Sequence, residues 1–143
     1  MDVEIKMLGR NDERVFTTVS PSLFDNAIDQ RLCKEFLNDP RHHIAVAIEN
    51  GVLIGFVSAV HYIHPDKPVE LWINEVSVDP QYQRRGIAKD LLRTILQVGI
   101  ELGCKEAWVL TDRSNLAAMR TYSSVGGSEY DKDMTMFTFY LNK

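Results

Sequence analysis

A stretch near the middle of the chain, residues 71–92, constrains the fold most, because it joins a strand to a helix through a turn suited to an anion. It reads LWINEVSVDPQYQRRGIAKDLL: a β-rich run, a turn with a proline, then two arginines and a glycine that open an apolar helix. Backbone N–H groups at a helix N-terminus are unpaired and carry a partial positive charge. The turn therefore predicts a phosphate-binding site built from Gln83, Arg84, Arg85, Gly86, Ile87 and Ala88.

Small residues give this turn its openness. Gly86 lets the chain approach a ligand closely, and the small side chain of Ala88 leaves the N-terminus of the helix accessible. Arg84 and Arg85 would lie near the bound anion. The spacing fits neither the dinucleotide fingerprint, which needs three glycines, nor the P-loop, which ends in Gly-Lys-Ser/Thr. The alternative is an ordinary connection between a strand and a helix, with exposed arginines.

The composition limits the kinds of partner. The net charge of −4 argues against nucleic acid and favours a cationic substrate. We expect one domain of 143 residues in the cytoplasm, because no apolar run is as long as a membrane span and the first residues alternate like a strand, unlike a signal peptide. Cys33 and Cys104 lack metal-ligand or CxxC spacing and are predicted to be free core thiols.

The first half of the chain predicts strands interrupted by two short helices. After a first strand in residues 1–10, residues 11–37 show helical spacing with a break at Ser20-Pro21. Residues 44–48 and 52–62 flank Asn50-Gly51, a strong hairpin signal, and predict adjacent antiparallel strands. A third long strand ends at Val78.

The second half predicts two helices and further strands. The helix near Gly86 has one apolar face and ends at Gly103; this face consists of Leu91, Leu92, Ile95, Leu96 and Leu102. The continuous apolar run in 106–110 predicts a strand buried on both faces, and Ser114 or Asn115 caps a helix that ends at Gly126-Gly127. Residues 134–141 alternate as a last strand, with room for another at 128–130. The prediction is an α/β fold with a mixed sheet of six or seven strands and helices on both faces.

The central motif resembles the acetyl-coenzyme A loop of the GCN5-related N-acetyltransferase (GNAT) superfamily. The matching residues are Gln83-x-x-Gly86-x-Ala88 after Val76-Ser77-Val78-Asp79-Pro80, and the order of elements extends the resemblance over nearly the whole chain. It implies a mostly antiparallel sheet whose fourth strand bulges and splays from the fifth. It also implies acetyl-CoA as acetyl donor, with the pantetheine arm paired to Val76 and Val78 and the diphosphate on N–H groups from Arg84 to Lys89.

Acetyl transfer from a thioester to an amine requires a neutral amine, stabilisation of the developing oxyanion and a proton for the departing thiolate. The backbone N–H of Val76 is the candidate oxyanion donor. Asn115 and Tyr122 are separated by about two helical turns and share one face. The resemblance implies that Asn115 touches the cofactor arm and that Tyr122 faces the sulfur as general acid; the alternative for Tyr122 is a buried core aromatic.

Carboxylates are the candidates for the general base. Glu75 lies on the strand that would line the acceptor pocket, and Asp112 follows the next strand. Which one is the base stays open; the alternatives are an edge charge for Glu75 and a turn residue for Asp112. Trp72, Glu75, Asp112 and Asp133 are the predicted acceptor-binding residues. Because His61 and His64 have no third and fourth partner at suitable spacing, we expect no metal site.

A narrower resemblance concerns the acceptor. Residues 61–80 and 102–127 look like the small aminoglycoside 3-N-acetyltransferases. This implies direct attack by the 3-amino group of an aminoglycoside in a ternary complex, and a role in antibiotic resistance. The alternatives are another small amine or a protein N-terminus as acceptor, or an acyl-CoA-binding module without catalysis. Oligomeric state stays open, since the C-terminal strand could pair across a homodimer.

Overall fold

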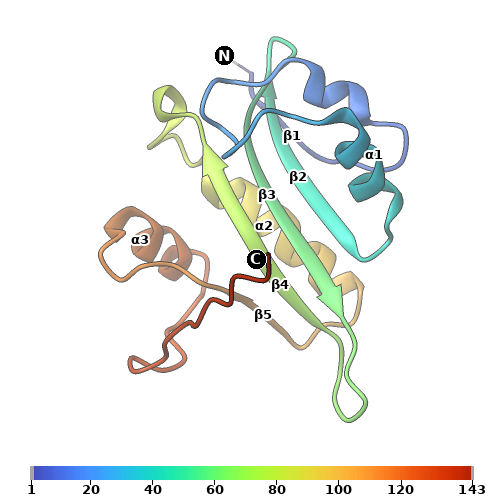
Figure 1. Cartoon of the computed structure of the whole chain (residues 1–143). Helices are drawn as coiled ribbons and strands as arrows, with labels where there is room; N and C mark the ends of the chain where they lie inside the picture. The colour runs from blue at the N-terminus through green and yellow to red at the C-terminus, as the bar shows by residue number, and fades with distance from the viewer. Residues whose placement is uncertain (1, 143) are drawn as a thin grey trace.

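The computed structural model describes residues 2–142, which form a five-stranded sheet with helices on both faces (Figure 1). The strands lie in the order β1-β2-β3-β4-β5; the first four are antiparallel to their neighbours and β4–β5 is parallel. The predicted α/β class is therefore confirmed. The elements are β1 Glu4–Met7, the 3-10 helix η1 Glu13–Thr17, α1 Gln30–Asn38, β2 His42–Glu49, β3 Val52–Tyr62, β4 Glu70–Val78, the 3-10 helix η2 Pro80–Tyr82, α2 Ile87–Glu101, β5 Glu106–Val109 and α3 Leu116–Ser124.

The β2–β3 hairpin has the turn that its sequence predicts. Asn50 and Gly51 adopt φ angles of 50° and 77°, the left-handed region that a two-residue hairpin turn requires. The two strands then pair from His42 with Val60 to Glu49 with Val52.

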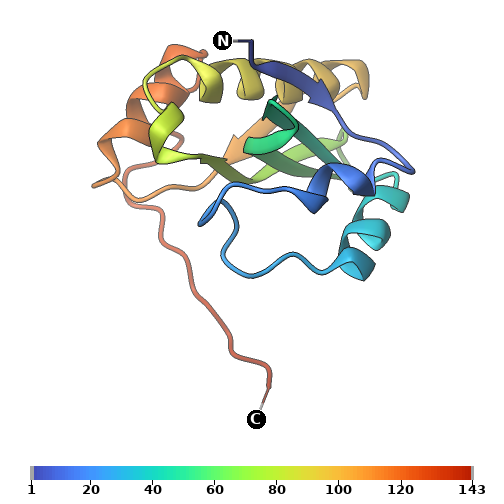
Figure 2. The same ribbon diagram turned by 90° about the horizontal axis from the view of Figure 1, so that it is seen from above.

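Two cores lie on opposite faces of the sheet, with α2 over one face and η1 and α1 over the other (Figure 2). Successive side chains of a strand point to opposite faces. Ala45 and Ala47 of β2 therefore belong to the core under α2, whereas Ile44 and Val46 belong to the core under α1. Cys33 is buried in this second core, and both cysteines are free.

The long helix α2 packs on the sheet through one apolar face and has a glycine in the left-handed region at each end. It begins after Gly86 and buries Leu91, Leu92 and Ile95 completely. It ends where Gly103 adopts a φ of 86° and the Cys104 N–H donates to the Gly99 carbonyl over 2.9 Å. Leu102, predicted on the apolar face, lies past the last turn and is 37% exposed. Among residues 2–142, no helix is long and apolar enough to cross a membrane.

The sheet opens between β4 and β5, as predicted. On its β3 side, β4 pairs Glu75 with Ser58 and Ile73 with Ala59, which leaves Asn74 as an inserted bulge residue. On its other side, β4 pairs with β5 only from Glu70 to Ile73. From Asn74 onward this edge of β4 has no strand partner within the described residues.

Two predictions about the C-terminal third are wrong. Neither 128–130 nor 134–141 forms a strand, so the described sheet has five strands; the last residues extend away from the domain (Figure 2). The strand β5 is not buried on both faces, because Trp108 is 38% exposed. The reason is its position: β5 is an edge strand in this chain, so an apolar run that is typical of interior strands is covered on one side only.

Candidate active site

The turn before α2 presents a row of unpaired N–H groups. Arg84 and Gly86 adopt left-handed φ angles of 66° and 78°, and no side chain caps the helix. The first hydrogen bond of the helix runs from the Asp90 N–H to the Gly86 carbonyl over 3.0 Å. The N–H groups of residues 84–89 have no hydrogen-bond partner in the described chain, and a Cβ built on Gly86 would meet no atom within 4 Å. This is an open concave donor site of the kind that binds anions.

Side chains fix this turn to the end of β4. The Gln83 side-chain amide donates to the Val78 carbonyl over 3.2 Å, and the Asp79 carboxylate accepts from the Gln81 N–H over 2.7 Å and from the Ser20 hydroxyl. The guanidinium of Arg85 lies 5.1 Å from the ring centre of Tyr82. Gln83, which the sequence predicts to bind the cofactor, therefore ties the turn to the end of β4 through its side-chain amide.

The exposed edge of β4 points backbone groups into the splay. The Asp79 N–H donates to the Ile54 carbonyl over 2.8 Å, so Asp79 and Ile54 form a hydrogen-bonded pair of the antiparallel ladder. Because such pairs alternate along a ladder, Val78 and Val76 occupy non-hydrogen-bonded positions and direct their N–H and C=O groups away from β3. The Val76 N–H is consequently a fixed donor facing the opening between β4 and β5.

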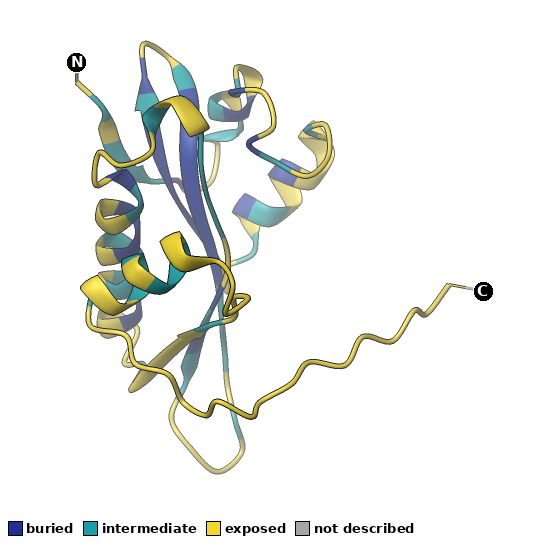
Figure 3. Ribbon diagram, turned by 90° about the vertical axis from the view of Figure 1, so that its left-hand side faces the viewer, coloured by how far each residue is buried: buried dark blue, intermediate teal, exposed yellow. Residues whose placement is uncertain are grey.

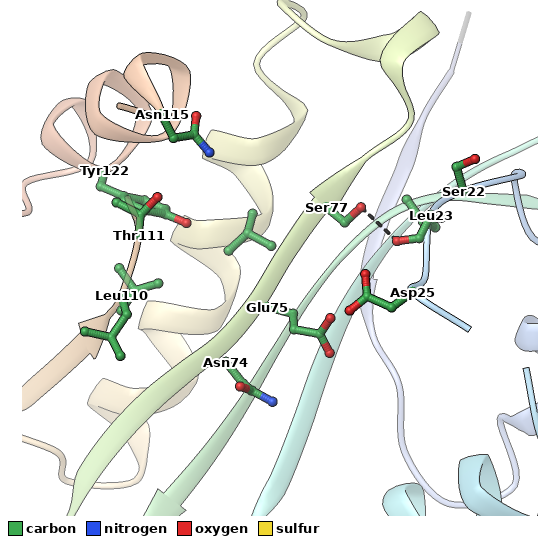
Figure 4. Close-up of a pocket in the computed structure, with 12 residues that line it drawn as sticks. Ser22, Leu23, Asp25, Asn74, Glu75, Ser77, Leu110, Thr111, Asn115 and Tyr122 are labelled. Carbon is green, nitrogen blue, oxygen red and sulfur yellow. Dashed lines mark hydrogen bonds between the residues drawn. The ribbon is translucent and has the colours of Figure 1, made fainter. Parts of the chain in front are cut away.

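A cavity of about 330 Å³ occupies this opening (Figure 4). Three parts of the chain form its wall: the segment between η1 and α1, the bulged part of β4, and the region from the end of β5 to α3. Its lining contains two carboxylates and no Lys, Arg or His, so it is suited to a cation. The lining residues are Ser22, Leu23, Asp25, Asn74, Glu75, Val76, Ser77, Val109, Leu110, Thr111, Asn115 and Tyr122.

Glu75 and Asp25 lie on the same side of β4 and point into the cavity from facing segments (Figure 4). The segment that carries Asp25 is tied to β4 by the Ser77 hydroxyl, which donates to the Leu23 carbonyl over 2.9 Å. Burial raises the pKa of the Glu75 carboxyl, and the negative charge of Asp25 raises it further. A carboxylate in this environment takes up a proton more readily than a fully solvated glutamate.

Helix α3 brings Asn115 and Tyr122 to the opposite wall (Figure 4). As predicted, Asn115 caps the helix, with its side-chain oxygen accepting from the Ala118 N–H over 3.1 Å. At the other end, Gly126 adopts a φ of 98° and the Gly127 N–H donates to the Tyr122 carbonyl over 2.9 Å. Burial raises the pKa of the Tyr122 phenol, so the hydroxyl keeps its proton at neutral pH.

Not all predicted site residues reach the cavity. Glu75, Val76, Asn115 and Tyr122 line it, whereas Trp72, Asp112 and Asp133 are not among the lining residues. The Trp72 ring stacks on Trp108 at 5.4 Å between β4 and β5. The backbone carbonyl of Asp112 accepts from the Asn115 N–H over 2.9 Å in the turn before α3, and Asp133 is exposed.

Asp25 is the main residue that the sequence interpretation missed. It lies in an irregular segment, residues 18–29, whose sequence has neither strand nor helix periodicity. Only the fold places this segment across from the β4 bulge, so no local pattern could have indicated it.

The histidines form no metal centre. His43 and His61, on neighbouring strands, have ring nitrogens 2.7 Å apart, and burial together with the neighbouring His61 lowers the pKa of His43 to about 4. In residues 2–142 no group of three metal-ligating side chains is assembled.

Comparison with known proteins identifies relatives over most of the chain. The acetyltransferase (GNAT) family model matches residues 10–126. Human N-acetyltransferase 8 is 31% identical over 69% of this chain and 47% of its own length, and N-alpha-acetyltransferase RimI of Mycobacterium tuberculosis is 36% identical over 63% and 54%. The chain thus spans about half the length of these curated relatives. A crystal structure of an aminoglycoside acetyltransferase from an uncultured soil metagenomic sample, in complex with trehalose, has a TM-score of 0.86 at 23% identity, covering 98% of this chain and 97% of that one.

Proposed function

The chain belongs to the GNAT acetyltransferase family, and we propose that it is an acetyl-CoA-dependent N-acetyltransferase whose acceptor is an amino group of an aminoglycoside. One observation carries the proposal: an open anion-binding turn, a free strand edge and a carboxylate-lined cavity meet at the splay between β4 and β5. The structural likeness to an aminoglycoside acetyltransferase supports this choice of acceptor.

The donor half of the site fits the parts of acetyl-CoA. The unpaired N–H groups of residues 84–89, with the exposed side chains of Arg84 and Arg85, suit a diphosphate. The backbone groups of Val76 and Val78 suit the amides of the pantetheine arm, which would add to the sheet like a strand. When bound, acetyl-CoA supplies an acetyl group activated as a thioester.

Three residues around the cavity each have a separate role in acetyl transfer. Glu75 accepts a proton from the acceptor ammonium, directly or through a water, so that the neutral amine nitrogen can bond to the acetyl carbon. The Val76 N–H donates to the acetyl oxygen as it gains negative charge. As the carbon–sulfur bond breaks, the Tyr122 hydroxyl gives its proton to the sulfur, and the second proton that the attacking nitrogen loses returns to the Tyr122 oxygen through water. The products are an acetamide and a free thiol, and no covalent enzyme intermediate forms.

The acceptor half favours a molecule with several positive charges. Asp25 and Glu75 offer two carboxylates, while the cavity lining provides no cation that would compete for them. An aminoglycoside has several ammonium groups, of which one loses its proton and the others can pair with these acids. The 3-amino group is the proposed position, from the resemblance of residues 61–80 and 102–127. Neutralising it would weaken binding of the drug to RNA phosphates and make the protein a resistance factor.

A protein N-terminus is the second candidate acceptor, because the chain is 36% identical to RimI over 90 residues. The same α-amine chemistry would use Glu75 and Tyr122 equally. The two candidates differ in the number of positive charges presented to the Asp25 side of the cavity.

Free thiol release with a panel of acceptors tests the proposal. We expect aminoglycosides to give kcat/KM values at least about 100-fold above that of a peptide with a single free N-terminal amine, since the two carboxylates can pair with several ammonium groups of the drug but with only one of the peptide. NMR of the product should show the acetamide at the 3-amino group. Thiol release with the peptide alone would transfer the proposal to the second candidate, and none with any aminoglycoside would refute the first.

The glycine of the anion-binding turn provides a separate prediction about the donor. Replacing Gly86 with alanine places a Cβ in the open space where the diphosphate would lie and strains a φ of 78°. We expect the Kd for coenzyme A, measured by calorimetry, to rise about 10-fold, or about 1.4 kcal/mol. Gly51→Ala is the matched control, because Gly51 has a φ of 77° and equally open surroundings but lies in the β2–β3 turn. An equal change of Kd in both variants would argue against binding at the Gly86 turn.

A further inference from the structure

The hydroxyl of Ser58 is a buried polar group that the proposed mechanism does not use. From Leu53 to Ala59 every residue of the central strand β3 is buried, and Ser58 alone among them has a polar side chain (Figure 3). Ser58 is 6% exposed, and its Oγ atom has no hydrogen-bond partner among residues 2–142. Burying a hydroxyl without a partner is unfavourable. An acceptor within reach of this hydroxyl would remove that cost.

The register of the sheet places Ser58 directly opposite Glu75. The two residues are partners in the β3–β4 ladder, at the bulge. Side chains that are directly opposite in an antiparallel pair point to the same face, with their Cβ atoms about 5 Å apart. Over that separation a serine hydroxyl and a glutamate carboxylate can form a hydrogen bond of ordinary length. Rotation of the Glu75 side chain, which is exposed to the cavity, is sufficient to bring the two groups together.

The face of the sheet that carries Ser58 is also the face covered by the segment with Asp25. Ile44, the partner of Ser58 on β2, and Phe56, two residues before Ser58, belong to the core under α1. The ring of Phe24 stacks on the ring of Phe56, with centroids 4.2 Å apart. Asp25 follows directly in the chain. Ser58 therefore lies where both carboxylates of the cavity approach the β3–β4 ladder.

The surroundings of Glu75 lack a group that favours its ionised form. The titratable side chains of the cavity lining are Asp25, Glu75 and Tyr122. Burial, and then the charge of Asp25, raise the pKa of Glu75. A hydrogen-bond donor acts in the opposite direction, because it stabilises the carboxylate. The neighbouring hydroxyl of Ser77 already donates to the Leu23 carbonyl, whereas the hydroxyl of Ser58 is uncommitted.

We propose that Ser58 is a positioning residue for the proposed base: its hydroxyl donates a hydrogen bond to the Glu75 carboxylate and holds that side chain in its ionised form. One carboxylate oxygen accepts from Ser58, and the other remains free to take a proton from the acceptor ammonium. The assignment rests on the role of Glu75 in the proposed function and adds a group that does not itself touch the acceptor. It also accounts for the polar side chain in the buried part of β3.

The pH dependence of Ser58→Ala tests the assignment. Alanine removes only the hydroxyl, so the pKa of Glu75 should rise further and the acidic limb of kcat should move to higher pH. Below the midpoint of the limb we expect kcat to be about 10-fold lower, the effect of one hydrogen bond to a charged group. At alkaline pH kcat should approach that of the unchanged protein. Ser58→Thr keeps a hydroxyl on the same carbon and should restore the original limb.

NMR titration of isotope-labelled glutamate carboxyl groups gives a second measurement that does not depend on acetyl transfer. The Glu75 signal, assigned by its absence in Glu75→Gln, should titrate at higher pH in Ser58→Ala than in the unchanged protein. Ser124→Ala is the hydroxyl control, because the Ser124 hydroxyl donates to the Thr121 carbonyl at the exposed end of α3, outside the cavity lining. It should change neither the titration nor kcat. An unmoved Glu75 titration in Ser58→Ala would overturn the assignment.

The outcomes separate this assignment from the proposed function. If the protein acetylates aminoglycosides and Ser58→Ala leaves the acidic limb in place, only the role of Ser58 fails. If no acceptor is acetylated but the Glu75 titration moves, the proposed function fails and the hydrogen bond is supported. A higher KM for the acceptor with an unmoved limb would show that Ser58 serves Asp25 instead. A purely structural role would lower the melting temperature without moving the limb, and either of these last two results would refute the assignment.

Discussion

Glu75→Gln is expected to lower kcat for amine acetylation about 100- to 1,000-fold at pH 7, the range that a positioned general base contributes. Glutamine keeps the size of the side chain and can still hydrogen-bond, but it cannot accept a proton from the acceptor ammonium. Glu75 lies at the β4 bulge and points into the cavity at the splay, so the substitution removes the proposed base without removing the wall. Steady-state kinetics with saturating acetyl-CoA measure the effect.

The pH dependence of the same variant separates a base from a binding residue. A base must be deprotonated, and burial together with Asp25 raises the pKa of Glu75, so activity should fall as the pH drops through this raised pKa. Glu75→Gln should lose this acidic limb. Asp25→Asn removes the neighbouring charge that raises the pKa, so in that variant the limb should move to lower pH while KM for the acceptor rises.

Asp66→Asn provides the control for charge alone, because Asp66 is an exposed carboxylate in the distant turn between β3 and β4. It should leave both kcat and the pH profile unchanged. An acidic limb that survives in Glu75→Gln would mean that another group accepts the proton, and Asp112 would then be the next residue to test.

The parts of the fold that could be predicted are those fixed by local chemistry. Asn50-Gly51 supplies two residues that tolerate positive φ, and this alone determines the hairpin. Asn115 and Gly126-Gly127 bracket α3 because a side-chain oxygen satisfies N–H groups at one end and glycine satisfies carbonyls at the other. The open turn at Gly86 follows from the same rules for helix termini.

The features that could not be predicted from the sequence depend on which distant segments of the chain contact one another in the fold. Residues 134–141 have the alternation of a strand, but alternation does not specify a partner, and no strand of residues 2–142 pairs with them. The exposure of β5 has the same cause, because within the described residues only β4 pairs with it and its other edge has no partner. Asp25 comes from a segment without periodicity, so its approach to Glu75 depends on packing over the sheet.

The bulge at Asn74 links the predictable and unpredictable parts of the site. It shifts the register between β3 and β4 just where pairing of β4 with β5 ends. The shift leaves Val76 in a position whose N–H faces the splay and places Glu75 beside Asp25. The single inserted residue Asn74 thereby leaves the backbone edge of β4 free at Val76 and orients the side chain of the proposed base, Glu75.

Tyr122→Phe is expected to lower kcat about 100-fold with little change in the Kd for coenzyme A, because it removes one proton donor and no packing volume. The Tyr122 hydroxyl has no hydrogen-bond partner among the described residues, so its loss leaves no buried group unpaired. The melting temperature should therefore stay close to that of the unchanged protein. Kinetics, calorimetry with coenzyme A and thermal unfolding together give the three quantities.

Tyr130→Phe is the matched control, since Tyr130 is 92% exposed and outside the cavity lining, and it should leave kcat unchanged. A structural role for Tyr122 would lower thermal stability and weaken coenzyme A binding along with turnover, because the ring would then act through packing. A catalytic role changes turnover alone. Unchanged turnover in Tyr122→Phe would remove the tyrosine from the mechanism and require water to protonate the departing sulfur.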